Sequence, residues 1–198
     1  AEEQSVHDGM FRGMINLTEK SLPNTIQVHG RDFSIHTDFR IWMRFSIEFQ
    51  RWKNAGCGGV LDISYLFTDE LPAFYDIEDY AGIFDFAFPA CKVPNGSGDG
   101  DQTLYYEYDG DYIYAAFMQN YKIDLMETGL HWHKFLALLK GLSGTMLNEI
   151  MGYRAYASSK QEKPEQQYRK LKYAWTPLPE ETEEEKEAEE EFNQYFGS

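Results

Sequence analysis

The stretch that decides the fold runs from Tyr108 to Arg154 and reads YDGDYIYAAFMQNYKIDLMETGLHWHKFLALLKGLSGTMLNEIMGYR. Its apolar residues recur at the spacing that places them on one face of a helix. Three helices are expected, over residues 109–121, 130–142 and 145–156, and Asp109 is placed to cap the first. Because the connections between them are short, neighbouring helices are expected to pack antiparallel. The stretch therefore predicts a helix bundle.

A β-hairpin and a long helix are expected upstream of this bundle. Residues 25–36 alternate apolar and polar side chains around Gly30, and glycine supplies the positive φ that a tight turn needs. Thr37 is the expected N-cap of the helix that follows, and Asp38 suits the positive end of its dipole. Apolar side chains at helical spacing, Trp42 among them, give that helix a wide face to bury.

The other face of this long helix is basic. Arg40, Arg44 and Arg51, together with Lys53, are candidates for docking an acidic segment, including the protein's own tail. The alternative is that these side chains simply face solvent.

Further helices are expected over residues 60–67 and 77–88, with a turn between them. Another is expected to begin near Pro164, since proline is favoured in the first turn of a helix, and to run to about Trp175.

The predicted fold class is mainly α (α+β), with an N-terminal β-hairpin packed on an antiparallel helix bundle and an acidic C-terminal tail. Residues 1–25 are expected to form a flexible arm, and residues 26–175 a single mostly helical domain. Within that domain, residues 95–102 (NGSGDGDQ) are expected to form a flexible loop. Residues 176–198 are the tail. A chain of 198 residues can bury a core without metal or disulfide staples.

The charge of the chain is concentrated in its tail. The formal net charge is −15, and Glu180 to Glu191 alone carries nine Glu against one Lys, a net of −8. This balance argues against nonspecific binding to duplex nucleic acid, which needs clustered cations. Phe192, Tyr195 and Phe196 follow the acidic run, and a short induced helix would present them together. They are candidate partner-binding residues, and the alternative is an inert solubilising tail.

The sequence holds no recognisable catalytic motif. It has no G-x-S-x-G, no P-loop, no G-x-G-x-x-G and no H-E-x-x-H. His131 and His133 are the best metal candidates, but side chains two positions apart on a helix point apart. Asp99 and Asp101 lack the ligand spacing and the closing Glu of a calcium loop. We therefore expect no cofactor and no enzymatic activity.

The cysteines and the hydropathy pattern also carry little chemistry. Cys57 and Cys91 lie 34 positions apart, which fits neither a zinc site nor a redox C-x-x-C, so free thiols are expected. No apolar run is long enough to span a membrane. Near the end of the bundle, Gly152 is expected to allow a close helix crossing. Arg154 is expected either to anchor a carboxylate bidentately or to be exposed.

Six short motifs occur in a fixed order along the chain. They are T-D-F-R-x-W (37–42), D-Y-I-Y-A-A-F (111–117), Y-x-I-D-L (121–125), L-H-W-x-K-F-x-A-L (130–138), K-G-L (140–142) and I-M-G-Y-R (150–154). In order and wording they resemble the bacteriophage Gp-fifteen family, from tailed phages and prophages of mostly Gram-positive bacteria. That family usually reads H-W-W where this chain has His131, Trp132 and His133, and the resemblance implies a packing role for His131 and Trp132.

The resemblance also implies a function. Genes of that family typically lie between those of the major tail protein and the tape-measure protein. The leading expectation is a non-enzymatic tail assembly chaperone that binds the tape-measure protein, with the major tail protein as a second partner. The alternatives are a structural component of the mature tail, an acidic inhibitor that mimics nucleic acid, and a metal-dependent enzyme built on His131 and His133. The expected location is the bacterial host cytoplasm or the virion tail. Neither nucleic acid nor a membrane is expected as a partner. Whether the protein forms a homo-oligomer is left open.

Overall fold

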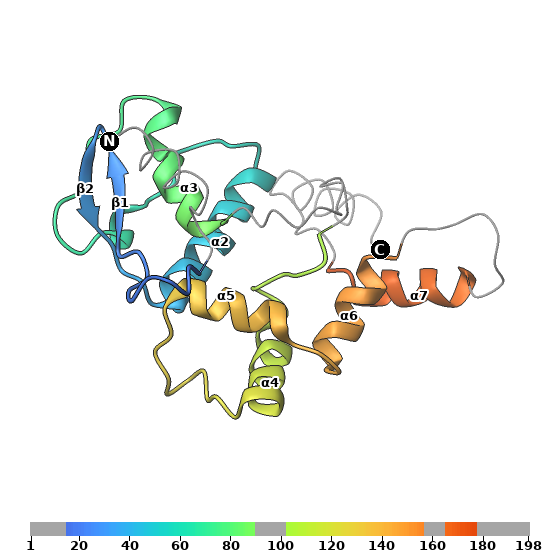
Figure 1. Cartoon of the computed structure of the whole chain (residues 1–198). Coiled ribbons are helices and arrows are strands. Elements are labelled where there is room, and N and C mark those ends of the chain that lie inside the picture. Colours follow the sequence, from blue (N-terminus) through green and yellow to red (C-terminus); the bar gives the residue numbers. More distant parts are fainter. Residues whose placement is uncertain (1–14, 90–101, 157–164, 178–198) are drawn as a thin grey trace, which may run out of the picture. The chain divides into compact units, whose positions relative to one another are not determined.

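The computed structural model describes residues 15–89, 102–156 and 165–177 (Figure 1). Most of the expected arm, the loop over residues 95–101 and the tail from residue 178 onward lie outside the described residues. The chain divides into two compact units, Ala1–Gly152 (unit 1) and Tyr153–Ser198 (unit 2). Each unit is described by itself.

Unit 1 begins with the predicted hairpin. Strands β1 (Thr25–Val28) and β2 (Arg31–Ser34) pair antiparallel, with Val28 opposite Arg31. The two turn residues, His29 and Gly30, both have positive φ values, 50° and 72°. Positive φ at both central positions defines the type I′ turn, whose twist matches that of paired strands. The hairpin prediction is confirmed.

Helix α2 (Phe39–Asn54) follows, and its N-cap is Asp38. The Asp38 carboxylate accepts a hydrogen bond from the amide of Arg40 at 2.9 Å. The expectation that Thr37 is the cap is therefore wrong. The reason is a backbone bridge to the start of α5, in which the Thr37 carbonyl accepts from the amide of Trp132 at 2.7 Å. Because this bridge keeps residues 37–38 extended, the helix begins one residue later than expected.

The chain between α2 and the next helices is mostly irregular. The helix expected over residues 60–67 is wrong, because this segment contains only the short 3₁₀ helix η1 (Ser64–Leu66). Its backbone is used by the hairpin: the amide of His36 donates to Leu66 O at 2.9 Å, and the amide of Thr68 donates to Ser34 O at 3.1 Å. This pairing with the edge of β2 competes with helix formation.

The expected helix over residues 77–88 is present as the 3₁₀ helix η2 (Ile77–Tyr80) followed by α3 (Ala81–Ala87). Helix α3 lies close to β1 at Gly82. A Cβ atom at Gly82 would lie 3.1 Å from the carbonyl oxygen of Gln27 and 3.3 Å from the Cβ of Ile26. A side chain at this position would therefore force α3 and β1 apart by a few tenths of an ångström.

Helices α4 (Gly110–Tyr121), α5 (Trp132–Gly141) and α6 (Met146–Arg154) follow the predicted order. Asp109 stands at the N-cap position of α4, but its buried carboxylate accepts from the amide of Tyr105 at 2.8 Å instead of capping the helix. Before α6, Thr145 and Asn148 exchange hydrogen bonds, since each side-chain oxygen accepts from the other's amide. This reciprocal pair is a helix start of the capping-box kind.

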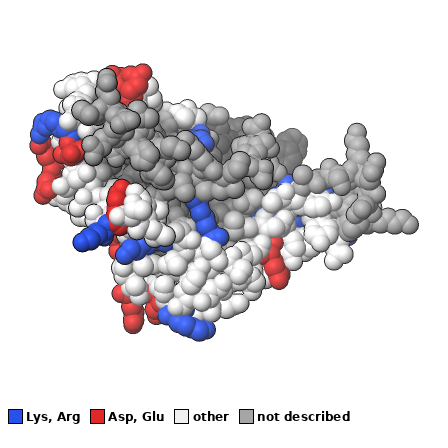
Figure 2. All heavy atoms as spheres, viewed as in Figure 1, with Lys and Arg blue, Asp and Glu red and all other residues white. Residues whose placement is uncertain are grey.

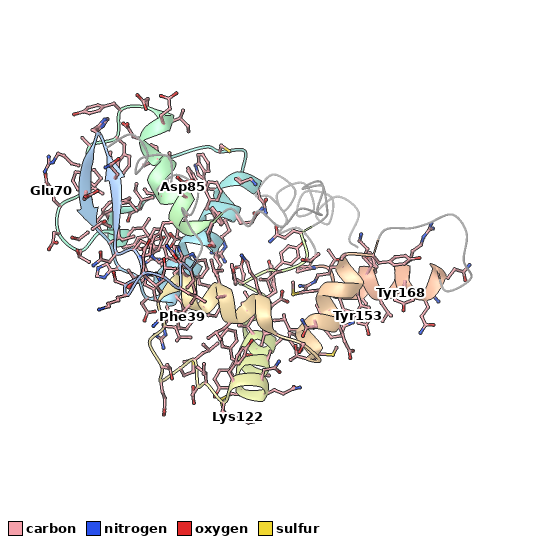
Figure 3. All side chains as sticks on the ribbon, viewed as in Figure 1. Phe39, Glu70, Asp85, Lys122, Tyr153 and Tyr168 are labelled. Atoms are coloured by element: carbon pink, nitrogen blue, oxygen red, sulfur yellow. The ribbon has the colours of Figure 1, made fainter. Side chains whose placement is uncertain are left out.

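Aromatic rings form the centre of the core of unit 1. Phe135 of α5 is fully buried and stacks on Phe39 of α2 at 4.8 Å and on Phe117 of α4 at 5.2 Å. Figure 3 shows Phe39 at the start of α2, beside α5. Trp42 of α2 is also fully buried, and its indole N–H donates to His36 O at 2.6 Å. Stacked aromatic rings from α2, α4 and α5 therefore form the centre of the core. Helices together with one β-hairpin make the mainly α fold that was predicted.

Unit 2 contains the fourth predicted helix, α7 (Glu165–Trp175), although Pro164 lies outside the described residues. The rings of Tyr156 and Tyr168 stack at 5.0 Å, and Lys172 Nζ donates to Tyr156 O at 3.0 Å. The C-terminal end of α6 is thus held against α7 within this unit. Across the described ranges, no helix combines the length and the apolar character that crossing a membrane would take.

Candidate protein-docking site

The three arginines predicted to bind a partner all have contacts inside unit 1. Arg40 pairs with Asp38 at 3.0 Å and donates to Leu125 O at 2.7 Å. Arg44 pairs with Glu48, one helical turn away, at 2.7 Å. Arg51 pairs with Glu107. On the face shown in Figure 2, basic and acidic side chains likewise lie next to one another at several places.

These contacts give the basic face of α2 a structural role. The guanidinium of Arg44 also lies over the ring of Tyr65 at 4.0 Å, and the Tyr65 hydroxyl donates to Glu48 at 2.6 Å. Burial and then this hydrogen bond raise the pKa of Tyr65 far above its usual range, which keeps the hydroxyl protonated as a donor. The arginine face thus joins α2 to the segments around it, and its role in binding a partner stays a prediction.

A different surface of α2 has the properties of a protein-docking site. Phe45, Phe49 and Trp52 recur at the i, i+4, i+7 spacing that aligns side chains along one face of a helix. Phe84 of α3 and Phe88, the residue that ends α3 as its C-cap, lie beside them. We call these five residues the aromatic ridge.

The rings of the aromatic ridge form one continuous cluster. Phe49 is its centre, with ring centroids 5.9 Å from Phe45, 6.0 Å from Trp52, 5.1 Å from Phe84 and 5.8 Å from Phe88. The rings of Phe84 and Phe88 lie 6.4 Å apart. These separations fall in the range in which aromatic pairs attract each other beyond simple burial.

Exposure increases along the ridge from the core to solvent. Phe45 is buried, Phe49, Trp52 and Phe84 are half-buried, and Phe88 is 46% exposed. Beyond Trp52, whose indole N–H donates to Gly59 O at 3.2 Å, Val60 is 98% exposed. Large aromatic side chains that are anchored at one end and open at the other are typical of binding hot spots.

Charged groups lie at the edge of the ridge. Lys53 Nζ lies 5.9 Å from the centre of the Phe49 ring, and the Arg51–Glu107 pair stands on the adjacent part of α2. An apolar centre with a charged rim is the usual anatomy of a protein–protein interface. From the sequence pattern, all apolar residues of α2 were expected to be buried. Helical spacing shows which residues share a face, but not which part of that face is exposed to solvent.

The two histidines meet, contrary to expectation. His131 is the N-cap of α5 and lies outside the helix proper, so its ring and that of His133 approach to 5.2 Å. The expectation that they point apart assumed that both were helical. His131 Nδ1 accepts from the amide of His133 at 3.1 Å, and Trp132 between them is buried, with its indole N–H donating to Ala87 O at 2.9 Å.

Both imidazoles form hydrogen bonds with backbone carbonyl groups. The Nε2 atoms of His131 and His133 lie 2.9 Å from Pro23 O and 3.0 Å from Phe86 O, and since a carbonyl can only accept, each Nε2 carries the hydrogen. Burial lowers the pKa of both imidazoles below the ordinary value, although these hydrogen bonds oppose the shift. His133 Nδ1 is buried, and no described residue bonds to it.

The described residues do not form a metal site. Within residues 15–89, 102–156 and 165–177, no three His, Cys, Asp or Glu side chains come together as metal ligands would. Cys57 is an exposed free thiol, while Cys91 and the acidic loop with Asp99 and Asp101 lie outside the described residues. The absence of a cofactor stays a prediction.

The last two predicted residues lie at the end of α6. Gly152 is exposed, and a Cβ atom there would meet no described atom within 4 Å, so the predicted close helix crossing is wrong for the described part of the chain. Arg154 is 3% exposed, and its Nε donates to Trp175 O at 2.7 Å. Burial excludes the exposed alternative, and a carboxylate partner stays a prediction. Phe192, Tyr195 and Phe196 lie outside the described residues.

Comparison with known proteins supports the family resemblance. Residues 85–176 match the family model described as Bacteriophage Gp15 protein. The match runs from α3 to the end of α7 and includes five of the six motifs, whereas the motif at residues 37–42 lies before it. No curated protein and no solved structure gives a significant match. Residues 85–176 are therefore similar to the bacteriophage Gp15 family, as the motifs predicted.

Proposed function

We propose that the protein is a non-enzymatic tail morphogenesis protein that acts as an assembly chaperone for the tape-measure protein. The family that it resembles is one of phage proteins, and the resemblance to that family implies a gene beside the tape-measure gene. The observation that carries the proposal is the aromatic ridge, an anchored apolar surface that is open to solvent at Phe88 and is followed along the chain by the exposed Val60.

The chemistry of the ridge suits an amphipathic helix as ligand. A tape-measure protein is long, apolar and helical, so before the tail tube encloses it, its apolar stripe must be shielded from water. An amphipathic helix presents anchors at i, i+3, i+4 and i+7 to an apolar surface. The ridge offers rings over a matching length, because Phe45 to Trp52 spans two turns of α2.

The rim supports the same proposal. Lys53 and the Arg51–Glu107 pair place both signs of charge beside the rings. Such rim charges add little affinity but set the orientation of a partner and speed its association. The acidic tail keeps a protein with an exposed apolar surface away from its own copies through charge repulsion.

The test is a pull-down from cells that co-express the protein with the tape-measure and major tail proteins of the same phage. The double variant Trp52→Ala/Phe88→Ala removes two ridge rings. The matched control, Tyr75→Ala/Ile77→Ala, removes two large side chains that are 80% and 77% exposed outside the ridge. We expect the ridge variant to weaken capture of the tape-measure protein about tenfold or more, since hot-spot truncations cost about 2 kcal/mol or more.

Two further readouts decide the role. Mass spectrometry of purified particles separates a chaperone, which is absent from the particle, from a structural tail component, which is present at fixed copy number. Equal capture by the ridge variant and the control would remove the ridge from the proposal. Deletion of Glu180 to Ser198 tests the predicted role of Phe192, Tyr195 and Phe196, and no change in capture or solubility would remove it.

A further inference from the structure

Helix α3 is too short to be stable without contacts to other elements. It spans seven residues, and isolated helices shorter than about 12–15 residues are marginal in water. The last carbonyl groups of a helix also find no amide partner within it. At this helix end the amide of Phe88 donates to Phe84 O at 2.8 Å, and the carbonyls of Phe86 and Ala87 depend on donors from elsewhere.

Two consecutive residues of α5 supply those donors. The indole N–H of Trp132 donates to Ala87 O at 2.9 Å, and Nε2 of His133 donates to Phe86 O at 3.0 Å. Both side chains are buried, so water does not compete for either bond. Because a buried carbonyl without a donor is costly, the end of α3 is held where these two donors stand. We call Trp132 and His133 the α3 clamp.

The clamp is joined by a ring contact that sets the rotation of α3 about its axis. The buried ring of Phe86 lies 4.4 Å from the ring of Trp42 and 4.5 Å from that of His133. At 100° per residue, Phe84 stands about 160° away from Phe86, on the opposite side of the helix. The side of α3 that contributes Phe84 and Phe88 to the aromatic ridge is therefore turned outward because the Phe86 side is held inward.

Phe88 depends most directly on the clamp. It follows Ala87 in the chain, and as the C-cap of α3 its φ of −125° and ψ of 65° are no longer helical. Its ring is half-exposed, yet the ring centroid lies 5.8 Å from that of Phe49. A half-exposed ring at the end of a short helix has little packing of its own, so the backbone that Trp132 holds decides where it lies.

We propose that Trp132 and His133 are positioning residues for the aromatic ridge. With both hydrogen bonds formed, Phe84 and Phe88 stay against Phe49 of α2. Without them, the end of α3 moves away and only the α2 half of the ridge keeps its place. A preorganised surface binds more tightly, because its side chains need not be ordered on binding. This consequence for binding rests on the proposed function of the ridge, whereas the clamp itself does not.

The test observes the ring at position 88 directly. Phe88 is replaced by 4-trifluoromethylphenylalanine in the full-length chain, and its ¹⁹F resonance is recorded in the folded protein and in urea. Trp132→Phe removes the N–H donor but keeps a ring, and His133→Leu removes the other donor but keeps an apolar side chain. We expect each to move the resonance at least halfway to its position in urea. His133→Gln keeps a donor and should restore the native resonance.

Tyr121→Phe is the matched control. It removes one hydroxyl that donates to Leu138 O at 2.9 Å, a helix carbonyl of α5 outside the clamp and the ridge, and it should leave the resonance unchanged. Circular dichroism and urea unfolding identify the variants that fold. If His133→Leu does not fold, the comparison of Trp132→Phe with Tyr121→Phe decides. A native resonance in the folded variants that lack a donor, or failure of His133→Gln to restore it, would overturn the proposal.

Capture of the tape-measure protein separates this inference from the proposed function. Trp132→Phe and His133→Leu should weaken capture about threefold or more, because the rings of α3 must then be ordered on binding. Displacement of the ring at position 88 with unchanged capture would overturn the role of the clamp in binding. A wild-type chain that captures no tape-measure protein would instead refute the proposed function, and the ¹⁹F resonances would still decide whether the clamp holds α3.

Discussion

Truncation of Phe135 is the sharpest test of the core. This side chain is fully buried, and the rings of Phe39, Phe117 and Trp132 surround it at 4.8, 5.2 and 5.6 Å. Phe135→Ala removes a ring that contacts both α2 and α4, and the aromatic neighbours cannot all move to fill the space. We expect a loss of about 3–5 kcal/mol in the free energy of unfolding, the range found for Phe→Ala in protein cores.

Thermal and urea unfolding, followed by circular dichroism, measure this loss. For a unit of this size, about 3–5 kcal/mol corresponds to a decrease in Tm of roughly 6–20 °C. Phe88→Ala is the matched control, because it removes the same ring from a position that is 46% exposed. We expect it to cost about 1–2 kcal/mol, in proportion to the smaller area withdrawn from water. If the two variants lost equal stability, the assignment of Phe135 to the centre of the core would be refuted.

Three further predictions follow from local geometry. Asp38→Ala should cost about 1–2 kcal/mol in urea unfolding as a lost N-cap, whereas Thr37→Ala should cost less than about 0.5 kcal/mol, and the reverse order would restore Thr37 as the cap. Gly82→Ala should destabilise the protein by about 1–2 kcal/mol, because overpacking against β1 exceeds the gain in helix propensity. Gly152→Ala lies in open space and should stabilise the protein by about 0.5–1 kcal/mol. If both variants changed the free energy of unfolding in the same direction, the contact at Gly82 would be contradicted. Burial lowers the pKa of His133, so the unfolded state binds its proton more tightly. Stability should therefore fall as the pH decreases below about 6.5, and His133→Gln, which keeps a donor but does not titrate, should flatten this part of a stability–pH profile.

Local patterns account for what could be predicted. The hairpin follows from alternation around Gly30, and α2, α4 and α5 follow from apolar residues at helical spacing. These signals need only neighbouring residues, since helix and turn geometry are set within a few positions of the chain. The motifs between residues 111 and 154 likewise indicated the family resemblance, which the match over residues 85–176 confirms.

Contacts between distant segments account for what could not be predicted. Ser34 and His36 bond to the backbone of residues 66–68, and this pairing turned an expected helix into an irregular segment. The aromatic ridge is likewise assembled from α2 and α3, whose rings are more than 30 positions apart in the sequence. No spacing rule within either helix shows that the two faces meet, or that Phe88 stays open to solvent.

The sequence by itself determined most of the helical segments, where the hairpin turns, where the charge lies and which family the chain resembles. Only the tertiary structure decided that Asp38 caps α2, that the rings of His131 and His133 meet, and that Arg40, Arg44 and Arg51 are engaged within unit 1. The physical reason is the same in each case. Propensity and periodicity act along the chain, whereas caps, ion pairs and ring contacts depend on which distant backbone and side-chain groups the fold brings within a few ångströms.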